Sequence, residues 1–186
     1  MITDDDRFLA GFEECTRPLS QWHHREHIKV AYLYISRYSL ETAITKMSWG
    51  IQAFNAAHQV EEGLDRGYHE TMTQAWMRLV HCTFFEFGPS ETADMFVDKH
   101  TQLLSKRALL FFYSRDLIMS PEAKAHFVEP DLAPLPHSKK DPPGYGIVTH
   151  LHSVQEPKPD VAIEIPNVIH IETAQADLLP QPRPVT

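Results

Sequence analysis

The sequence predicts an all-α protein: an antiparallel bundle of six or seven helices over residues 1–128, followed by a proline-rich C-terminal extension over residues 129–186. Three observations support this class. Apolar residues recur at the 3.6-residue helical period in the first part, and residues that start or stop helices stand between these segments. Only three of the 14 prolines precede residue 129, each where a helix is expected to begin or end. The other 11 fall in the last 58 residues, where they exclude long helices.

The expected helices follow one another with short connections, which favours antiparallel neighbours. We expect them at about 4–15, 23–37, 40–58, 69–87, 91–103 and 105–118, with a last short helix after Ser120. Ser39 and Ser90 stand at N-cap positions, and Ser120 precedes a proline at the first helical position. Gly88 and the proline after it end the helix before them.

The extension after residue 128 has a different pattern. The stretches GIVTHLHSV, DVAIEI and NVIHIET alternate apolar and polar residues or are β-branched, which is typical of short strands. Prolines confine such strands to short, peripheral positions. The extension is therefore either a small β-appendage or a mobile tail, and it is the segment that we expect to contact a partner protein.

Composition limits the class of protein. A chain of 186 residues with 42% apolar and 23% charged residues is typical of one soluble globular domain. A net charge of −8 and the lack of a Lys/Arg run argue against nucleic-acid binding and slightly disfavour highly anionic substrates. No apolar run is long enough for a membrane span, and the first 20 residues lack a signal-peptide core. Two cysteines, Cys15 and Cys82, make no disulfide framework, so we expect a cytoplasmic protein.

Histidines supply the candidate site. His24 and His27 fall on one face of the expected helix 23–37, on the stripe that continues through Ile28. His69 falls on the apolar face of the expected helix 69–87. In an up-and-down bundle these two helices start at the same end, so the three imidazoles are predicted to lie at a similar height.

Three inward imidazoles with an open coordination position are the ligand set of a divalent metal, zinc first, with iron or manganese as alternatives. Helix N-termini disfavour further positive charge, so the rings are expected to be neutral, as ligation requires. Glu70 and Glu26 adjoin the histidines and are candidate proton-transfer residues; their other interpretation is first-turn charge at a helix start. His23 can replace His24, because its spacing of four residues from His27 also suits a ligand pair.

Three functions follow from these residues. The first is a small metal-dependent enzyme, hydrolytic or oxidative, that activates water or a small substrate. The second is a binding module in which the histidines orient a small apolar or carbonyl ligand, and the third is a structural interaction protein. The sequence has no HExxH, Glu-x-x-His, G-x-S-x-G, P-loop or G-x-G-x-x-G motif to choose among them.

Four stretches resemble a group of bacterial all-helical proteins of unknown function: HREHIKVAYLYI, FNAAH, GYHETMTQAW and YSRDLIMSPEAKAHFVEPDLAPLP. The motifs are HxEHxxxAxxY and GYHETxTxxW, and the resemblance covers about residues 8–136. It implies that His24, His27 and residues 68–71 are motif positions, which favours His24 over His23 in the site. It implies no particular activity.

Overall fold

The computed structural model of the protein describes residues 2–138, and these residues are helical, as the sequence predicts. The helices are α1 (Asp4–Glu13), η1 (Leu19–Gln21), α2 (His24–Ile35), α3 (Leu40–Ala57), α4 (Glu70–Phe87), α5 (Ala93–Lys99), η2 (Thr101–Leu104), η3 (Lys106–Phe111), α6 (Arg115–Ile118) and α7 (Pro121–Ala125), where η marks a 3-10 helix. None of them is both long enough and apolar enough to cross a lipid bilayer. The strands expected in the extension lie outside the described residues.

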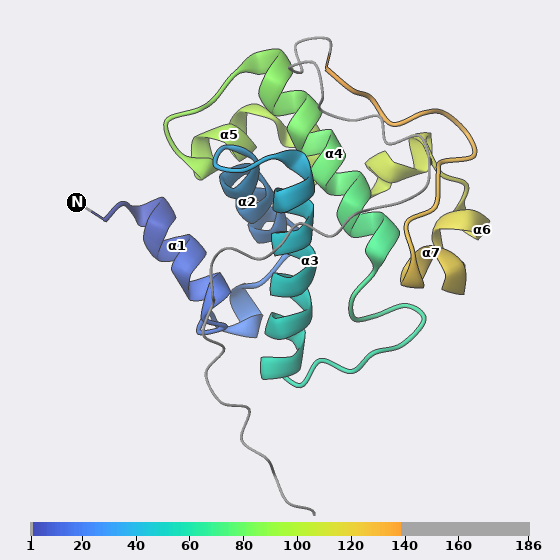
Figure 1. Cartoon of the computed structure of the whole chain (residues 1–186), viewed down its shortest axis with the longest axis horizontal. Coiled ribbons are helices and arrows are strands. Elements are labelled where there is room, and N and C mark those ends of the chain that lie inside the picture. Colours follow the sequence, from blue (N-terminus) through green and yellow to red (C-terminus); the bar gives the residue numbers. More distant parts are fainter. Residues whose placement is uncertain (1, 139–186) are drawn as a thin grey trace, which may run out of the picture. The chain divides into compact units, whose positions relative to one another are not determined.

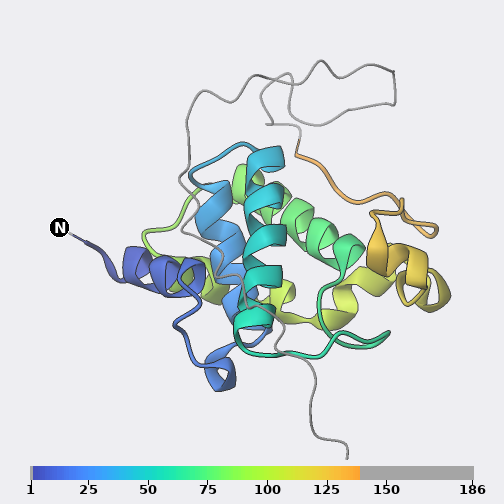
Figure 2. The same cartoon turned by 60° about the horizontal axis from the view of Figure 1, so that its bottom comes forward.

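Helices α2, α3 and α4 form the centre of the fold and pack on one another (Figure 1). The second half of α2 is buried all round, from Val30 to Ile35, because α3, α4 and α5 cover it from different sides. Figure 2 shows α2 and α3 side by side, with α1 against one flank and α7 beyond α4. The apolar run VAYLYI, which has no polar face, is thus the sequence of a core helix.

Two of the three predicted capping residues start helices in the structure. Ser39 accepts a hydrogen bond from the amide of Thr42 at 3.3 Å, and Ser120 caps α7 with a proline at the first helical turn. The third, Ser90, does not cap α5, because the N-cap of this helix is Thr92. The backbone of Ser90 is instead held by the hydroxyl of Tyr32, which donates to its carbonyl at 2.7 Å.

The segment after α5 is less regular than the sequence predicts. The expected helix 91–103 ends as an α-helix at Lys99, and the expected helix 105–118 is divided into η3 and α6. Ser114 causes this division: its hydroxyl accepts from the amide of Leu117 at 3.2 Å, which starts a new helix. Its own amide donates to Asp131 at 2.7 Å and so cannot continue η3.

Residues 129–138, which follow the predicted domain boundary at 128, still contact the bundle. The amide of Leu132 donates to the carbonyl of Phe112 at 2.9 Å, and Leu135 packs against the hydrophobic core. Just before the boundary, the hydroxyl of Thr71 accepts from the amide of Val128 at 3.1 Å. The division of the chain at residue 128 therefore stays a prediction, with the packed chain running beyond it.

Candidate functional site

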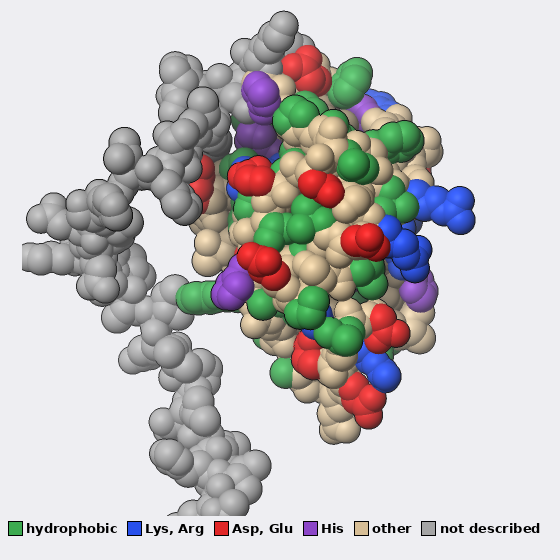
Figure 3. Space-filling model, turned by 90° about the vertical axis from the view of Figure 1, so that its right-hand side faces the viewer, with side chains coloured by type: hydrophobic (Ala, Val, Ile, Leu, Met, Phe, Trp, Pro, Cys, Tyr) green, Lys and Arg blue, Asp and Glu red, His purple; other side chains and the backbone are tan. Residues whose placement is uncertain are grey.

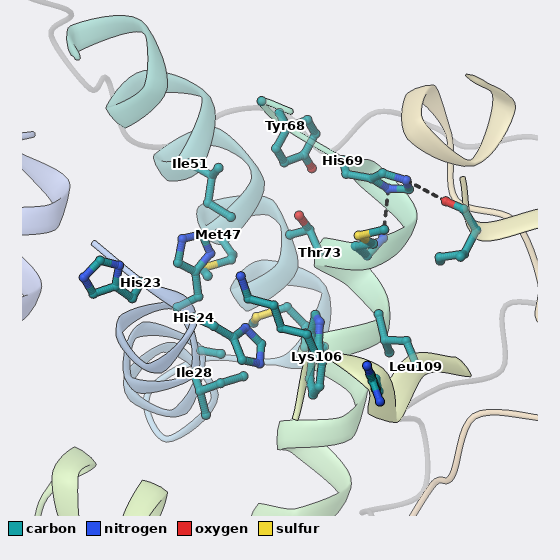
Figure 4. Close-up of a pocket in the computed structure, with 18 of the residues that line it drawn as sticks. His23, His24, Ile28, Met47, Ile51, Tyr68, His69, Thr73, Lys106 and Leu109 are labelled. Atoms are coloured by element: carbon teal, nitrogen blue, oxygen red, sulfur yellow. Dashed lines mark hydrogen bonds between the residues drawn. The ribbon is translucent and has the colours of Figure 1, made fainter. Parts of the chain in front are cut away.

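A cavity of about 590 Å³ lies among α2, α3, α4 and the segment from η3 to α6 (Figure 4). Apolar side chains make up most of its wall. Two of the three tryptophans and four of the six methionines of the chain contribute to it: Trp22, Trp76, Met47, Met72, Met77 and Met119. We call this space the histidine cavity, because His23, His24, His27 and His69 also line it.

The structure therefore brings the three predicted histidines to one cavity. His24 and His27 stand one turn apart on α2, and His69 immediately precedes α4 on the other side of the space. His23, the alternative to His24, is the exposed N-cap residue of α2 and lies at the edge of the same cavity. The helix starts thus position these residues together, but the three inward rings have different surroundings.

Both ring nitrogens of His69 have hydrogen-bond partners. Nδ1 accepts from the amide of Met72 at 3.2 Å and so caps α4, and Nε2 donates to the carbonyl of Ile118 at 2.9 Å (Figure 4). One nitrogen accepts while the other donates, which is the pattern of a neutral imidazole. Burial lowers the pKa of His69, and the positive charge of Lys124 lowers it further. His69 can ligate a metal only by releasing one of these two partners.

The two ring nitrogens of His24 differ in their hydrogen bonding. Its Nε2 donates to the carbonyl of Leu103 at 2.9 Å, and its edge contacts the ring of Trp76 with 4.6 Å between centroids. Nδ1 has no hydrogen-bond partner among the described residues. Burial is the main cause of the lowered pKa of His24, and the charge of Lys106 adds to it.

Of the three histidines, His27 has the fewest hydrogen bonds to the described residues. Its ring packs on Trp22 with 4.8 Å between centroids, and within the described part of the chain neither nitrogen has a hydrogen-bond partner. Burial lowers the pKa of His27 to about 4, and the positive charges of His24 and Lys106 act in the same direction. The rings are thus neutral as expected, but burial rather than the helix N-terminus is the main cause. His27 offers the cavity a neutral imidazole that no group among residues 2–138 uses.

The two predicted proton-transfer residues have structural partners. Glu26 accepts from the amide of His23 at 3.0 Å, which completes the start of α2. Glu70 accepts from the hydroxyl of Tyr68 at 2.5 Å and from the amide of Gln74 at 2.7 Å. Neither carboxylate is among the described residues that line the histidine cavity. These contacts correspond to the first-turn interpretation of both residues.

A metal site with His24, His27 and His69 as ligands, for zinc or for iron or manganese, stays a prediction. Within residues 2–138, no group of three or more His, Cys, Asp or Glu side chains is gathered closely enough to hold a metal ion. The two partners of His69 explain why its ring is directed toward the backbone of α4 and α6.

Sequence reasoning missed three basic residues of the site: Lys106 and Arg107 on η3 and Arg115 on α6 all line the cavity. A signal for them exists in the sequence, since residues 99–115 contain four basic residues and no acidic one. This segment was expected to be helical from its apolar spacing, which gives no indication of where its charged side chains lie.

The connection from α3 to α4 forms one edge of the cavity through Gly67 and Tyr68. Lys124 of α7 holds this loop: its Nζ donates to the carbonyls of Arg66, at 2.9 Å, and Tyr68, and pairs with Glu62 at 3.1 Å. Glu62 in turn accepts from the amide of Tyr68 at 2.9 Å. The connection from α3 to α4 is therefore fastened to α7.

No known protein family, no curated protein and no solved structure matches this chain. The resemblance to the bacterial group stays a prediction. Fold and site together define the class as a small helical protein with a cavity of methionine, tryptophan and neutral histidine side chains.

Proposed function

We propose that the protein binds a small organic molecule in the histidine cavity, and that the histidines orient the ligand. The observation that carries this proposal is His27, a neutral imidazole with no hydrogen-bond partner among residues 2–138, in a wall that is mostly apolar. Ligand sites characteristically combine an apolar wall with a few polar groups that fix orientation. A histidine with a purely structural role, such as His69, has its hydrogen bonds satisfied within the protein.

The size and the wall of the cavity suit a ligand of about drug size. Its volume of about 590 Å³ falls within the range of roughly 300–1,000 Å³ of small-molecule sites. Methionine side chains are flexible and polarisable, so a wall with four of them adapts to ligands of different shape. The two tryptophans supply flat surfaces for an aromatic or branched body.

The cavity offers a ligand both hydrogen-bond acceptors and a hydrogen-bond donor. His24 and His27 each provide a hydrogen-bond acceptor, a ring nitrogen that no group in the described part of the chain contacts by a hydrogen bond. Trp22 lines the cavity, and its buried indole N–H has no partner among the described residues, so it is an available donor. An unpaired buried donor costs free energy that a carbonyl or similar group of the ligand recovers on binding.

Fluorescence of N-phenyl-1-naphthylamine, a neutral apolar probe, tests the proposal. We expect saturable binding of one probe per chain to the wild type, which quenches tryptophan emission. Ala31→Leu and Thr73→Phe each enlarge a side chain of the wall and should abolish binding. Ala53→Leu makes the same change as the first variant at an exposed position of α3 outside the cavity and serves as the control.

Folding of each variant is checked by circular dichroism, and two filling variants are used in case one does not fold. Absence of probe binding to the wild type would overturn the proposal. So would binding that persists in both folded filling variants, because the probe would then lie elsewhere.

A further inference from the structure

We infer that the ligand is an organic anion, whose apolar body lies against the methionine and tryptophan wall and whose carboxylate or phosphate head contacts Lys106, Arg107 and Arg115. This inference rests on the proposed function and names the chemical class of its ligand. The three side chains line the histidine cavity and come from two consecutive elements, η3 and α6.

The first reason is that these cations have no acidic partner among residues 2–138. In the described part of the chain, none of Lys106, Arg107 and Arg115 makes an ion pair or a side-chain hydrogen bond. Most other basic side chains there do pair with carboxylates: Arg7, Arg25, Lys29, Arg37, Arg66 and Lys124. In a chain with 25 acidic and 17 basic residues, three cations that line one cavity without a carboxylate partner in the described part of the chain are not what the composition predicts. Their charge is available to a ligand.

The second reason is the charge of the cavity itself. No Asp or Glu occurs among the described residues that line it, whereas three cations and four histidines do. Burial is the main cause of the lowered pKa of His24 and His27, and the charge of Lys106 is a further, smaller cause for both, so this charge also acts on the interior of the cavity. A cavity with cations at one side and low-polarity walls concentrates a field that attracts anions.

The third reason is the character of the rim. Leu110 and Met119, which border the cavity beside the cations, are 42% and 41% exposed, and Phe111 is 77% exposed. Figure 3 shows Lys and Arg side chains beside exposed hydrophobic ones on one face of the molecule, with Asp and Glu side chains interspersed among them. A neighbouring pair of cationic and apolar surfaces fits an amphipathic anion better than it fits an inorganic ion or a sugar.

Arginine is well suited to this head group, since its guanidinium donates two parallel hydrogen bonds to a carboxylate or a phosphate. The net charge of −8 does not prevent binding. At physiological ionic strength, charges more than about 8 Å away are largely screened, so the local cations dominate. The expectation that acidic composition disfavours anionic ligands thus applies to the surface as a whole and not to this cavity.

Probes with one naphthyl body and different head groups test the inference. Binding of 1-naphthaleneacetate, 1-naphthyl phosphate and the neutral alcohol 2-(1-naphthyl)ethanol is measured by tryptophan quenching at two ionic strengths. We expect at least one of the anions to bind about tenfold or more tightly than the alcohol, the ratio that one charge-assisted hydrogen bond provides. The preference should decrease at higher salt.

The variant Lys106→Gln/Arg107→Gln/Arg115→Gln should reduce the affinity for the preferred anion to that for the alcohol. The alcohol should bind the variant as it binds the wild type, which also shows that the cavity is folded. The control Arg7→Gln/Lys46→Gln/Lys99→Gln removes the same charge at residues that do not line the cavity, and it should keep the preference.

The outcomes separate the two proposals. Equal binding of alcohol and anions, or an anion preference that survives the triple variant, overturns the inference and leaves the proposed function standing. Failure of every probe to bind overturns the proposed function itself.

Discussion

His69 connects the start of α4 to the end of α6, since its ring donates a hydrogen bond to the carbonyl of Ile118 at 2.9 Å. Ile118 is the last residue of α6, so this bond satisfies a carbonyl that the helix itself leaves free. The other ring nitrogen caps α4 through the amide of Met72. One side chain thus fixes two elements that border the histidine cavity, and this gives His69 a structural role that stability measurements can test.

Replacing His69 should destabilise the fold by removing two interactions, the helix cap and the bond to Ile118, whose contributions can be measured separately. His69→Ala loses the cap, worth about 1 kcal/mol, and the bond to Ile118, so we expect a total loss of about 1–3 kcal/mol in the free energy of unfolding. His69→Asn keeps a side chain that caps well and should recover about 1 kcal/mol of it. Urea unfolding followed by circular dichroism measures both values. An unchanged His69→Ala, or an Asn variant no more stable than the Ala variant, would contradict the assignment.

The same residue tests the metal site predicted from the sequence. A metal bound through His69 stabilises the folded state, so the thermal midpoint would fall when a chelator removes it. Because Met72 and Ile118 occupy both ring nitrogens, we expect the same midpoint with and without chelator. Elemental analysis of the wild type beside His24→Ala/His69→Ala measures the metal directly. One equivalent in the wild type that is missing from the variant would establish the three-histidine site.

Stability should fall as the pH is lowered below about 6.5. Burial lowers the pKa of His27 to about 4, whereas an unfolded histidine titrates near 6.5, so between these values the unfolded state binds more protons. The stabilisation by neutral His27 is therefore complete above pH 6.5 and is lost as the pH falls toward 4. About 2 kcal/mol of it should disappear between pH 6.5 and 5. The lowered pKa values of His24, His69 and His100 act in the same direction.

Unfolding of His27→Gln at pH 7, 6 and 5 isolates this contribution, and its slope with pH should be clearly smaller than that of the wild type. The range ends at pH 5 because carboxylates with lowered pKa values, such as Asp94, begin to contribute below it. His137→Gln, at an exposed position, controls for the removal of one histidine. Parallel pH curves for the wild type and His27→Gln would rule out a buried neutral ring at this position.

Helix positions were predictable where local signals decide them. Capping residues such as Ser39 and Ser120 act on amides three residues away, so the starts of α3 and α7 are visible in the sequence. The division of the expected helix 105–118 was not visible. It depends on the bond between Ser114 and Asp131, which are 17 residues apart, and no local pattern indicates such a partner.

The candidate site, too, could be predicted from the sequence only in part. The positions of His24, His27 and His69 follow from helix periodicity and from which helices start together, and the structure places all three in one cavity. Their differences do not follow from the pattern, because the partner of His69 on α6 and that of His24 on η2 are far away in sequence. The basic residues of η3 and α6 were missed for this reason too.

Gly67 should be intolerant of substitution. Its φ of +80° is rare for other residues, and a Cβ atom there would lie 2.2 Å from a carboxylate oxygen of Glu62. Glu62 holds the amide of Tyr68, so Gly67→Ala should detach the edge of the cavity as well as destabilise the fold by about 1–3 kcal/mol. Gly63→Ala is the matched control, because the φ of Gly63 is not positive and a Cβ atom there would lie no closer than 3.2 Å to its neighbours. We expect weaker binding of N-phenyl-1-naphthylamine only in Gly67→Ala; equal affinities in both variants would show that the loop does not shape the cavity.

Binding of an organic anion should be accompanied by uptake of protons. A negative head group in the histidine cavity stabilises the charged form of His27, so the pKa of His27 should rise from about 4 toward its ordinary value. The affinity for 1-naphthaleneacetate should therefore increase as the pH falls from 7 to 5, while that for the neutral alcohol stays constant. Calorimetry at pH 5.5 in two buffers with different ionisation enthalpies measures the protons taken up. His27→Gln should reduce the uptake and leave only the smaller part due to His24, which also lines the cavity. Identical binding enthalpies in the two buffers would mean that the head group lies too far from these rings to affect them.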